Sequence, residues 1–477
     1  MASSGTRLDF TTFHNIIDST LASAAQTRHG INPANKQPNR DVPVATKDDL
    51  DRAVTAAQRT FRTWSRVPVK ERQNALFAYS DALNAERDGL TKLLTQEQGK
   101  PSSQAEVEVG MAVTWIKEIA KLRLPETILE DNKERKVVQR YSPLGVACAI
   151  VPWNFPVLLA IGKVASAIIT GNSIIIKPSP YTPYCALKLA ELAIPFFPAG
   201  LVQALSGDDS LGSLITGHPG INKISFTGST LTGKRVAASC AQTLKHYTLE
   251  LGGNDPAIVC DDVDVDQIGI LSFLCSSQVC MTIKRVYVHE RIYDSFRTKL
   301  VNFVKSLPIG EGTQPNTFIG PVQNEMQYGK AKNLLASIAS DGLAASLGGE
   351  CHDSPGYFVN PTIIDNPPES SRVVTEEPFA PIVPLMKWAD EDDVIARANA
   401  GPMGLGASVW CKELERAQRI ADQLDSGSIW VNAHFDVAPH VPFGGHKDSG
   451  IGVEWGVEGL KAYCNSQTLW LQKGARL

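Results

Sequence analysis

Cysteine is a strong nucleophile when it is deprotonated, and this sequence has nine of them, at positions 148, 185, 240, 260, 275, 280, 351, 411 and 464. Their positions show no repeating spacing and no CxxC pair. Cys280 lies in the stretch SSQVCMTIKR, residues 276–285. A free cysteine is most often a small buried apolar side chain. Spacing alone therefore leaves two interpretations open for Cys280, a core residue or a nucleophile.

Glu250 is a second candidate for chemistry because it lies inside an apolar run, YTLELGGNDPAIV. Burial disfavours the charged carboxylate and raises its pKa toward the range in which a general base works near neutral pH. The alternative interpretation is a structural carboxylate that is paired with a cation.

A glycine-rich turn follows a predicted strand in SFTGSTLTGKR, where Gly228 and Gly233 precede Lys234. A P-loop would need Ser or Thr next to bind Mg²⁺, but position 235 is Arg, and the fingerprint GxGxxG is absent too. What remains is a helix N-terminus whose free N–H groups favour a phosphate or pyrophosphate. Lys177, in KPSP, ends the preceding predicted strand and could meet the same ligand. A tight turn and a solvated lysine are the alternative interpretations.

The composition is typical of a soluble globular protein with more than one domain. At 477 residues and 51.6 kDa, the chain exceeds one ordinary core, and 43 % of its residues are hydrophobic and 20 % charged. A net charge of −4 and a pI near 6.2 give no basic footprint for nucleic acid. No metal-ligand cluster is visible in the sequence.

The ends and the apolar stretches of the sequence predict a location. The start, MASSGTRLDFTTFH, lacks a basic segment followed by an apolar run, so no signal peptide is expected. The longest apolar stretch, VPWNFPVLLAIGKVASAII, is interrupted by Asn154 and Lys163 and carries two prolines, which argues against a membrane span. We therefore expect the cytoplasm. The peroxisome is the second choice, because the final residues, Ala-Arg-Leu, are similar to the Ser-Lys-Leu signal.

Periodicity predicts the elements that position these residues. Residues 46–98 have apolar residues at helical spacing, with Thr46 and Asp49 as a helix start and Gly99 as a stop. Residues 134–151 predict an extended ribbon that leads into a buried strand. Strands and helices then alternate as in a parallel doubly wound sheet, and the alternation restarts after residue 253 in a second α/β domain. Binding sites in such sheets form at the carboxyl ends of the strands.

Five motifs occur in one order: VPWNFP (151–156), FTGSTLTG (226–233), LELGG (249–253) with SSQVC (276–280), EEPFAPI (376–382), and PFGGHKDSGIGVEWG near the end. Together they resemble the aldehyde dehydrogenase superfamily, from about residue 30 to the C-terminus. The resemblance implies two doubly wound Rossmann-like α/β domains plus a small β ribbon for oligomerisation. The implied division is a dinucleotide-binding domain over 1–122 and 143–251, a catalytic domain over 252–450, and an oligomerisation ribbon and strand over 123–142 and 458–477.

The resemblance also implies the catalytic residues. Cys280 matches the nucleophile, which attacks an aldehyde as thiolate and becomes a thioester. Asn154 matches the side-chain donor to the oxyanion, together with the backbone N–H of Cys280. Glu250 matches the base that activates water to hydrolyse the thioester, a base that a CoA-acylating enzyme does not require. Lys163 and Glu454 match a pair that relays protons from the base, with a plain salt bridge as the alternative.

Binding residues follow from the same resemblance. Lys177 and Ser229 match contacts to ribose and pyrophosphate, and Glu377 matches the carboxylate that holds the nicotinamide ribose. The complete set implied for the dinucleotide is Pro152, Trp153, Lys177, Ser179, Gly228, Ser229, Gly233, Leu251, Gly252, Glu377 and Phe379. The set implied for the substrate is Phe155, Val279, Met281 and Phe443.

Three positions depart from the family pattern. Pro180 stands where many relatives have a glutamate that binds both hydroxyls of the adenosine ribose, so repulsion toward a 2′-phosphate is reduced. NAD is expected as the cofactor, and NADP stays open. Ser277 and Ala380 replace the usual glycines, and both are small.

The loop AHFDVAPHVPF, residues 433–443, corresponds to the family's substrate anchor. Its aromatic residues are only Phe435 and Phe443, while His434, Asp436 and His440 add polar groups. This composition predicts a polar or nitrogen-containing aldehyde. The alternative is that the histidines face solvent.

The sequence thus predicts an NAD(P)-dependent aldehyde dehydrogenase that forms a homodimer or homotetramer, with a small aldehyde as substrate and neither nucleic acid nor membrane as partner. Two alternatives stay open: a catalytically silent family member that serves as a scaffold, and a P-loop phosphotransferase. Cys280, Glu250 and Asn154 together argue against the first alternative, and Arg235 argues against the second.

Overall fold

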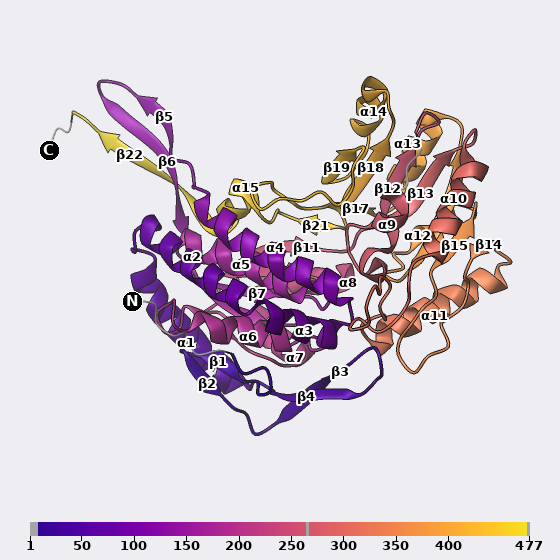
Figure 1. Cartoon of the computed structure of the whole chain (residues 1–477). Helices are drawn as coiled ribbons and strands as arrows, with labels where there is room; N and C mark the ends of the chain where they lie inside the picture. The colour runs from indigo at the N-terminus through magenta and orange to yellow at the C-terminus, as the bar shows by residue number, and fades with distance from the viewer. Residues whose placement is uncertain (1–7, 264–266, 475–477) are drawn as a thin grey trace.

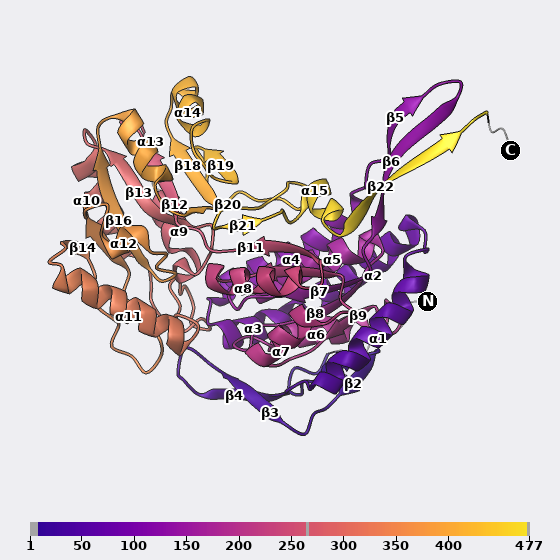
Figure 2. The ribbon, with the colours of Figure 1, turned by 180° about the vertical axis from the view of Figure 1, so that it is seen from behind.

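The structure, a computed structural model, describes residues 8–263 and 267–474. Figure 1 shows two lobes side by side, the first in indigo to magenta and the second mainly in orange, with an arm of strands that extends from the first lobe. Seen from behind, in Figure 2, the arm again stands apart from both lobes.

An eight-stranded sheet forms the centre of the first lobe, in the order β2-β1-β9-β8-β7-β10-β11-β21. The five strands from β9 to β11 in this order run parallel to one another, whereas β1 and β21 pair antiparallel with β9 and β11. The chain adds β8 and β9 on one side of β7 and then β10 and β11 on the other, so the direction of winding reverses between β7 and β10. The strands are β1 (Asn15–Ile17), β2 (Thr20–Ala22), β7 (Val146–Ile150), β8 (Ser173–Lys177), β9 (Val202–Ala204), β10 (Lys223–Thr227), β11 (His246–Glu250) and β21 (Gly450–Ile451).

Helices cover both faces of this sheet because its strands are apolar on both sides. Ala147 and Ala149 of β7 belong to one buried cluster with residues of α2 to α6, whereas Val146 and Cys148 belong to another with residues of α1, α7 and α8. Successive side chains of a strand point to opposite faces, so this pattern requires a helical layer on each face. The helices are α1 (Lys47–Trp64), α2 (Val69–Ala85), α3 (Arg87–Gln98), α4 (Ser102–Lys121), α5 (Pro156–Thr170), α6 (Tyr184–Ala193), α7 (Asp209–Gly217) and α8 (Thr230–Ala241).

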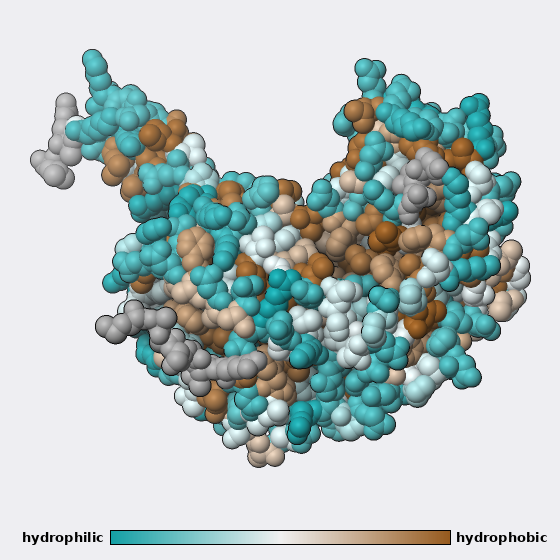
Figure 3. Space-filling view, viewed as in Figure 1, coloured by the Kyte–Doolittle hydropathy of each residue, from teal (hydrophilic) through white to brown (hydrophobic). Residues whose placement is uncertain are grey.

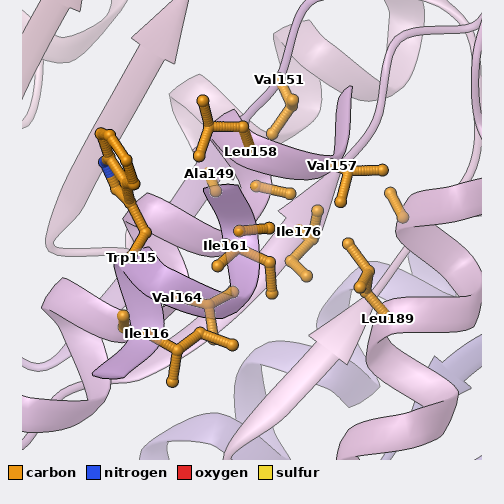
Figure 4. Packing of buried hydrophobic residues seen from close by; sticks show 14 of the residues in the cluster. Trp115, Ile116, Ala149, Val151, Val157, Leu158, Ile161, Val164, Ile176 and Leu189 are labelled. Atoms are coloured by element: carbon orange, nitrogen blue, oxygen red, sulfur yellow. The ribbon is translucent and has the colours of Figure 1, made fainter. Parts of the chain in front are cut away.

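Helix α5 accounts for the longest apolar stretch of the sequence. All of its residues except Leu159 are buried, because α4 and α2 pack on one side and the sheet lies on the other. Figure 4 shows this packing, with Trp115 of α4, Ile161 and Val164 of α5, and Ile176 of β8 in one apolar layer. Among the described residues, no helix combines the length and the apolar character needed to cross a bilayer.

Two helix boundaries predicted from the sequence are confirmed. The Thr46 hydroxyl accepts the N–H of Asp49 at 3.1 Å, and the Asp49 carboxylate accepts the N–H of Thr46 at 2.8 Å, which together form a capping box at the start of α1. Gly99 ends α3 with a φ of 92°, in the left-handed region that glycine adopts without a Cβ clash. Helices α4 and α5 were not predicted.

The second lobe contains a seven-stranded sheet in the order β14-β15-β16-β13-β12-β18-β19. Its neighbours run parallel, except for the antiparallel pair β14 and β15. Apolar clusters lie on both faces, as the predicted second α/β domain requires. The strands are β12 (Asp255–Val259), β13 (Ile283–His289), β14 (Ala345–Leu347), β15 (Thr362–Asp365), β16 (Ile382–Trp388), β18 (Gly406–Trp410) and β19 (Ser428–Val431), and the helices are α9 (Gln267–Phe273), the 3₁₀ turn η1 (Leu274–Ser277), α10 (Tyr293–Lys305), α11 (Glu325–Ser340), α12 (Arg372–Thr375), α13 (Glu391–Asn399) and α14 (Leu414–Ala421).

The arm is a three-stranded sheet in the order β22-β6-β5. Its strands are β5 (Thr127–Asp131), β6 (Arg135–Pro143) and β22 (Cys464–Gln472). The predicted ribbon and terminal strand are therefore present, although the strand begins only at Cys464, after α15 (Gly456–Lys461). Two short pairs complete the fold, β3 (Thr27–Ile31) with β4 (Pro38–Pro43) and β17 (Met403–Gly404) with β20 (His446–Lys447).

Candidate active site

The carboxyl edge of the first sheet brings several strand ends into line. Lys177, the last residue of β8, pairs with Ile150 at the end of β7, and Ile150 pairs with Phe226 of β10. Glu250, the last residue of β11, lies on the next strand. The winding reverses between β7 and β10, and ligands of such sheets bind outside this reversal point. Loop 151–156, which follows β7, therefore borders the expected site.

The second lobe contributes from the opposite ends of its strands. Cys280 precedes β13 and Glu377 precedes β16, so both lie at the amino edge of the second sheet. The expectation that site residues lie at the carboxyl ends of the strands holds for the first sheet and is wrong for the second. The link between the lobes explains the difference: a Cβ on Gly253, between β11 and β12, would meet the carbonyl oxygen of Cys280 at 2.5 Å. The two edges therefore meet at this link.

Cys280 is half-buried and follows a strained turn. Cys275, Ser276 and Ser277 have φ angles of 50°, 56° and 58°, in the region that side chains with a Cβ disfavour by about 1–2 kcal/mol per residue. The Ser277 hydroxyl donates to the carbonyl oxygen of Ser272 at 2.6 Å and helps to hold this turn. The positive φ also gives a physical reason for the glycine that the family usually has at this position.

Glu250 and Cys280 each hold a raised pKa. Burial raises the pKa of Glu250 to about 8, and the nearby Lys163 and the Cys280 thiol lower it while Glu454 raises it. Burial also raises the pKa of Cys280 well above its usual value, and a negative charge on Glu250 raises it further. Two neighbouring acids cannot both ionise at low cost, so a charge on either group disfavours ionisation of the other. The Oε1 atom of Glu250 is buried and has no hydrogen-bond partner among the described residues.

Asn154 reaches the chain just before Cys280. Its Nδ2 donates to the carbonyl oxygen of Gln278 at 3.0 Å, and an amide NH₂ group has a second N–H to donate. A buried lysine holds this loop in place: Lys100 donates to the backbone oxygen of Asn154 at 2.8 Å. Lys100 also forms an ion pair with Glu108. Oxygen Oε1 of Glu108 in turn accepts the N–H groups at the start of α5, at 2.9 and 3.1 Å.

Lys163 and Glu454 form a buried ion pair with 2.9 Å between Nζ and Oε1. Lys163 also donates to the Ser225 hydroxyl at 2.9 Å, and Ser225 donates to Glu454. The pair is thus a salt bridge, as the alternative interpretation has it. Both charges also act on the pKa of Glu250, so the pair lies near that carboxyl group.

Glu377 faces the link between the lobes. Its Oε1 accepts the N–H of Gly253 at 3.3 Å and lies 3.2 Å from Nζ of Lys284. A Cβ on Gly252 would meet Oε2 of Glu377 at 2.6 Å, so only glycine allows the carboxylate to lie against this backbone. Phe379, two residues later, packs edge-to-face on Trp153 with 5.3 Å between ring centroids. Pro152, the residue before Trp153 in the sequence, is half-buried.

The predicted phosphate turn lies farther along the first sheet. Ser229 is the N-cap of α8, and its hydroxyl accepts the N–H of Thr232 at 3.3 Å. A Cβ on Gly233 would meet the Leu251 side chain at 2.5 Å, so this glycine lets α8 pack against the chain after β11. Lys234, which a P-loop would direct at phosphate, instead lies 2.8 Å from Asp448. Gly228 lies between β10 and Ser229, and the buried Ser179 follows β8.

Cys280 packs against the apolar core of the first lobe. The four predicted substrate residues belong to one buried cluster, against which Cys280 packs: Phe155, Val279, Met281 and Phe443. Trp455 belongs to it as well and packs on Phe443, with 5.5 Å between ring centroids. Figure 3 shows apolar atoms, in brown, gathered in the hollow between the lobes.

The polar groups of the substrate loop do not line this cluster as predicted. His434 is buried, and its Nε2 lies 2.9 Å from the carbonyl oxygen of Met281, to which it donates. Burial lowers the pKa of His434 to about 3, so the ring is neutral. Asp436 and His440 are exposed. His434 is therefore a structural residue, which contradicts both interpretations made for it from the sequence and removes one reason to expect a polar aldehyde.

Some residues of this region were missed by the sequence analysis. Lys100, Glu108, Asp255 and Lys284 are charged and buried around the two loops. A signal was present, because each charge stands next to apolar residues or glycines that are themselves buried. The partners of these charges lie far away in sequence, so only the fold reveals them.

Comparison with known proteins identifies relatives over almost the whole chain. A family model described as the aldehyde dehydrogenase family matches residues 21–469. The putative aldehyde dehydrogenase FUS7 of Gibberella fujikuroi is 39 % identical over 471 residues, which cover 98 % of this chain and 100 % of the relative. The succinate-semialdehyde dehydrogenase [NADP(+)] of Escherichia coli K12 is 36 % identical over 441 residues, 91 % of this chain and 92 % of the relative.

Solved structures agree with the fold. A crystal structure of betaine aldehyde dehydrogenase from Staphylococcus aureus in complex with NAD⁺ superimposes with a TM-score of 0.94 at 31 % identity, and the match covers 98 % of this chain and 96 % of the other. An Escherichia coli NADP-dependent enzyme gives the same TM-score at 32 % identity, over 97 % and 98 % of the two chains. The predicted fold, with two Rossmann-like α/β lobes, is confirmed.

Proposed function

The chain belongs to the aldehyde dehydrogenase family and oxidises aldehydes to carboxylates with NAD(P), and we propose that Cys280, Asn154 and Glu250 carry out this reaction. One observation supports these roles above all: the three side chains, from two loops and the end of strand β11, lie together where the edges of the two sheets meet. Asn154 donates to the backbone oxygen of the residue two positions before Cys280, and negative charge on Glu250 raises the pKa of the thiol, so these two acids are near neighbours. A scaffold or a phosphotransferase has no need of this arrangement.

In the proposed mechanism, Cys280 loses its proton to solvent water, and its sulfur adds to the carbonyl carbon of the aldehyde. The carbonyl oxygen becomes an anion, to which Asn154 Nδ2 and the backbone N–H of Cys280 donate. Bound NAD(P) supplies the acceptor for the hydride that leaves this carbon. A thioester then remains on Cys280. Glu250 takes a proton from water as the water oxygen attacks the thioester, and the carboxylic acid leaves.

Lys163 and Glu454 are proposed to pass the proton onward from Glu250. Their ion pair is buried and linked through Ser225. A charged pair beside a buried base offers both a donor and an acceptor for a proton. The pair also stabilises the fold, so the two roles are compatible.

The carboxyl edge of the first sheet fits a dinucleotide. Helix α8 presents its N-terminus there, and Gly252 leaves room for the Glu377 carboxylate against the backbone. We propose that the adenosine and pyrophosphate end contacts Lys177, Ser179, Gly228, Ser229 and Gly233. We propose that the nicotinamide end contacts Pro152, Trp153, Leu251, Gly252, Glu377 and Phe379.

We propose NAD as the preferred cofactor. Burial lowers the pKa of Lys177, the nearby Arg28 lowers it further, and negative charge on Asp209 and Asp208 acts against both effects. The two carboxylates would repel a 2′-phosphate on the adenosine ribose. A glutamate at the position of Pro180 has this effect in many relatives. The apolar core against which Cys280 packs favours an apolar aldehyde over the polar one predicted from the sequence.

An assay of NADH and NADPH formation with aliphatic, aromatic and amino aldehydes tests these proposals. We expect kcat/KM to be higher with NAD than with NADP by about tenfold or more, equivalent to at least 1.4 kcal/mol. Among the aldehydes, we expect the apolar ones to have the lowest KM. Equal use of both cofactors would contradict the role of the carboxylates near Lys177. A preference for amino aldehydes would contradict the apolar assignment.

The arm is proposed to join subunits into a homodimer or homotetramer. Ile128, Leu129, Trp470 and Leu471 lie on it and are exposed, Trp470 by 56 %, and Figure 3 shows apolar atoms on this arm. Exposed apolar patches of this kind often mark subunit contacts. Light scattering should give two or four times the chain mass of 51.6 kDa, and the mass of a single chain would contradict the proposal.

The division into domains and the location remain proposals. Residues 1–122 with 143–251 are proposed to bind the dinucleotide, and 252–450 to carry the nucleophile, although β21 at Gly450–Ile451 already pairs with β11 of the first sheet. The cytoplasm is the proposed location. The Ala-Arg-Leu sequence that suggested the peroxisome, residues 475–477, lies outside the described residues. Fluorescence microscopy of the tagged chain, with and without this tripeptide, distinguishes the two compartments.

A further inference from the structure

Lys284 is a buried cation directly beneath the proposed nucleophile. Its side chain is only 2 % exposed, although it lies at the start of β13, four residues after Cys280. A buried lysine is costly unless its charge is paired and its N–H groups find acceptors. The family resemblance gave Lys284 no role, so the reason for this burial lies in its contacts.

The contacts of Lys284 connect two parts of the proposed site. The ammonium group donates to the carbonyl oxygen of Cys280 and lies 3.2 Å from Oε1 of Glu377. It also lies 5.9 Å from the centroid of the Phe379 ring. One side chain thus touches the backbone of the nucleophile and the carboxylate proposed for the nicotinamide ribose.

The Lys284 contact leaves Glu377 in a defined orientation. Both polar contacts of the carboxylate, to Lys284 and to the N–H of Gly253, use Oε1. The other oxygen, Oε2, lies against Gly252. A carboxylate held through one oxygen can accept ribose hydroxyls through the other, and fixing it beforehand lowers the entropy cost of binding.

Several titratable groups lie around Lys284. They are Cys280 on its own loop, Asp255 at the start of β12, Glu377 before β16, and the neutral His434. Glu250, at the end of β11, lies near Cys280. Lys284 lowers the pKa of Cys280, of Asp255 and of Glu377, whereas Glu250, Glu377 and Asp255 raise that of Cys280. The nucleophile therefore experiences one nearby cation against three acids.

We propose that Lys284 is a positioning residue that links cofactor binding to the nucleophile: it holds Glu377 ready for the nicotinamide ribose and stabilises negative charge on Cys280. This inference rests on the proposed roles of Cys280 and Glu377. The same ammonium group contacts the backbone of Cys280 and the carboxylate of Glu377. When a ribose binds to Glu377, the attraction between Lys284 and this carboxylate changes, and so does the stabilisation that Lys284 gives to a negative charge on Cys280.

The test compares Lys284→Met with Glu377→Gln in two measurements. Both variants should raise KM for NAD, roughly tenfold or more, as expected when a hydrogen bond to a charged group is lost. Their effects on the pH midpoint of Cys280 alkylation by iodoacetamide should have opposite signs. Removal of the cation should shift the midpoint to higher pH, and removal of the Glu377 charge should shift it to lower pH. A role in folding alone predicts neither shift.

Several controls make the comparison specific. The experiment uses the full chain with Cys351→Ser, since Cys351 is the other half-buried cysteine of the described chain, and mass spectrometry confirms labelling at Cys280. Lys92→Met, on the exposed side of α3, is the matched lysine control and should change neither measurement. Lys284→Arg, which keeps the charge, should retain the alkylation midpoint but bind NAD more weakly. If Lys284→Met fails to fold, Lys284→Arg still tests whether Lys284 contributes to NAD binding.

The double variant Lys284→Met/Glu377→Gln should bind NAD no more weakly than Glu377→Gln alone, because Lys284 affects NAD binding only through Glu377. Shifts of the same sign in the single variants, or an unchanged midpoint and KM in Lys284→Met, would overturn the inference. If instead the unmodified chain forms no NADH, or if its NADH formation survives labelling of Cys280, the proposed function itself fails.

Discussion

Replacing Cys280 by Ser should remove NADH formation with every aldehyde and lower kcat/KM by about 10⁴-fold or more, as the loss of a nucleophile does in enzymes that form covalent intermediates. A serine hydroxyl has almost the same size, so the apolar cluster and the turn at residues 275–277 should survive. What the variant lacks is an acidic, polarizable sulfur that can become an anion. The measurement is NADH absorbance over time, with NAD binding followed separately by quenching of tryptophan fluorescence.

The control is Cys351→Ser, which changes a half-buried cysteine in the second lobe away from the two loops. This control should keep kcat/KM within about threefold, as most changes away from a site do. Unchanged NAD binding in Cys280→Ser would show that its site is still folded. Residual NADH formation above a hundredth of the original rate would disprove the nucleophile assignment.

Glu250→Gln should separate the two halves of the reaction. Hydride transfer needs the thiol and Asn154, so the first turnover should still give close to one NADH per active site. The following steady state should be slower by roughly 10²- to 10⁴-fold, the usual contribution of a general base. Rapid-mixing measurements of NADH resolve the burst from the slow phase. The absence of a burst, together with a slow first turnover, would place Glu250 in the first half of the reaction instead.

The same variant tests the pH dependence. Burial raises the pKa of Glu250 to about 8, and a base works only when deprotonated. The steady-state rate of the original enzyme should therefore increase as pH rises toward about 8 and level off above it. Glu250→Gln should show no inflection of this origin. A rate that falls over this pH range would contradict the assignment.

Sequence patterns predicted the fold well where the signal was local. The capping box at Thr46 and the alternation of strands with helices each depend on residues close together in the chain. The α5 segment escaped prediction because a helix that is buried all round has no polar face to reveal its period. This helix is stabilised by tertiary packing, because α4 and the sheet enclose it.

The candidate site was predictable only in part. Glu250 stands out as a charge in an apolar run, but Cys280 could be chosen among nine cysteines only through several motifs taken together. Lys284 gives the same signal as Glu250, yet its meaning depends on Glu377, almost a hundred positions away in sequence. His434 shows the converse, because a polar residue in the predicted substrate loop turned inward to bind a backbone carbonyl.

The pairing of Lys163 with Glu454 has a consequence for biosynthesis. The two residues are 291 positions apart, and both are buried in the first lobe. During translation Lys163 emerges from the ribosome long before its partner, and a buried lysine without its carboxylate is costly. Strand β21 and the last strand of the arm also come from this late segment. The nascent chain therefore cannot complete its first lobe until β21 and Glu454 have been synthesised, which delays activity until this late segment has joined the first sheet.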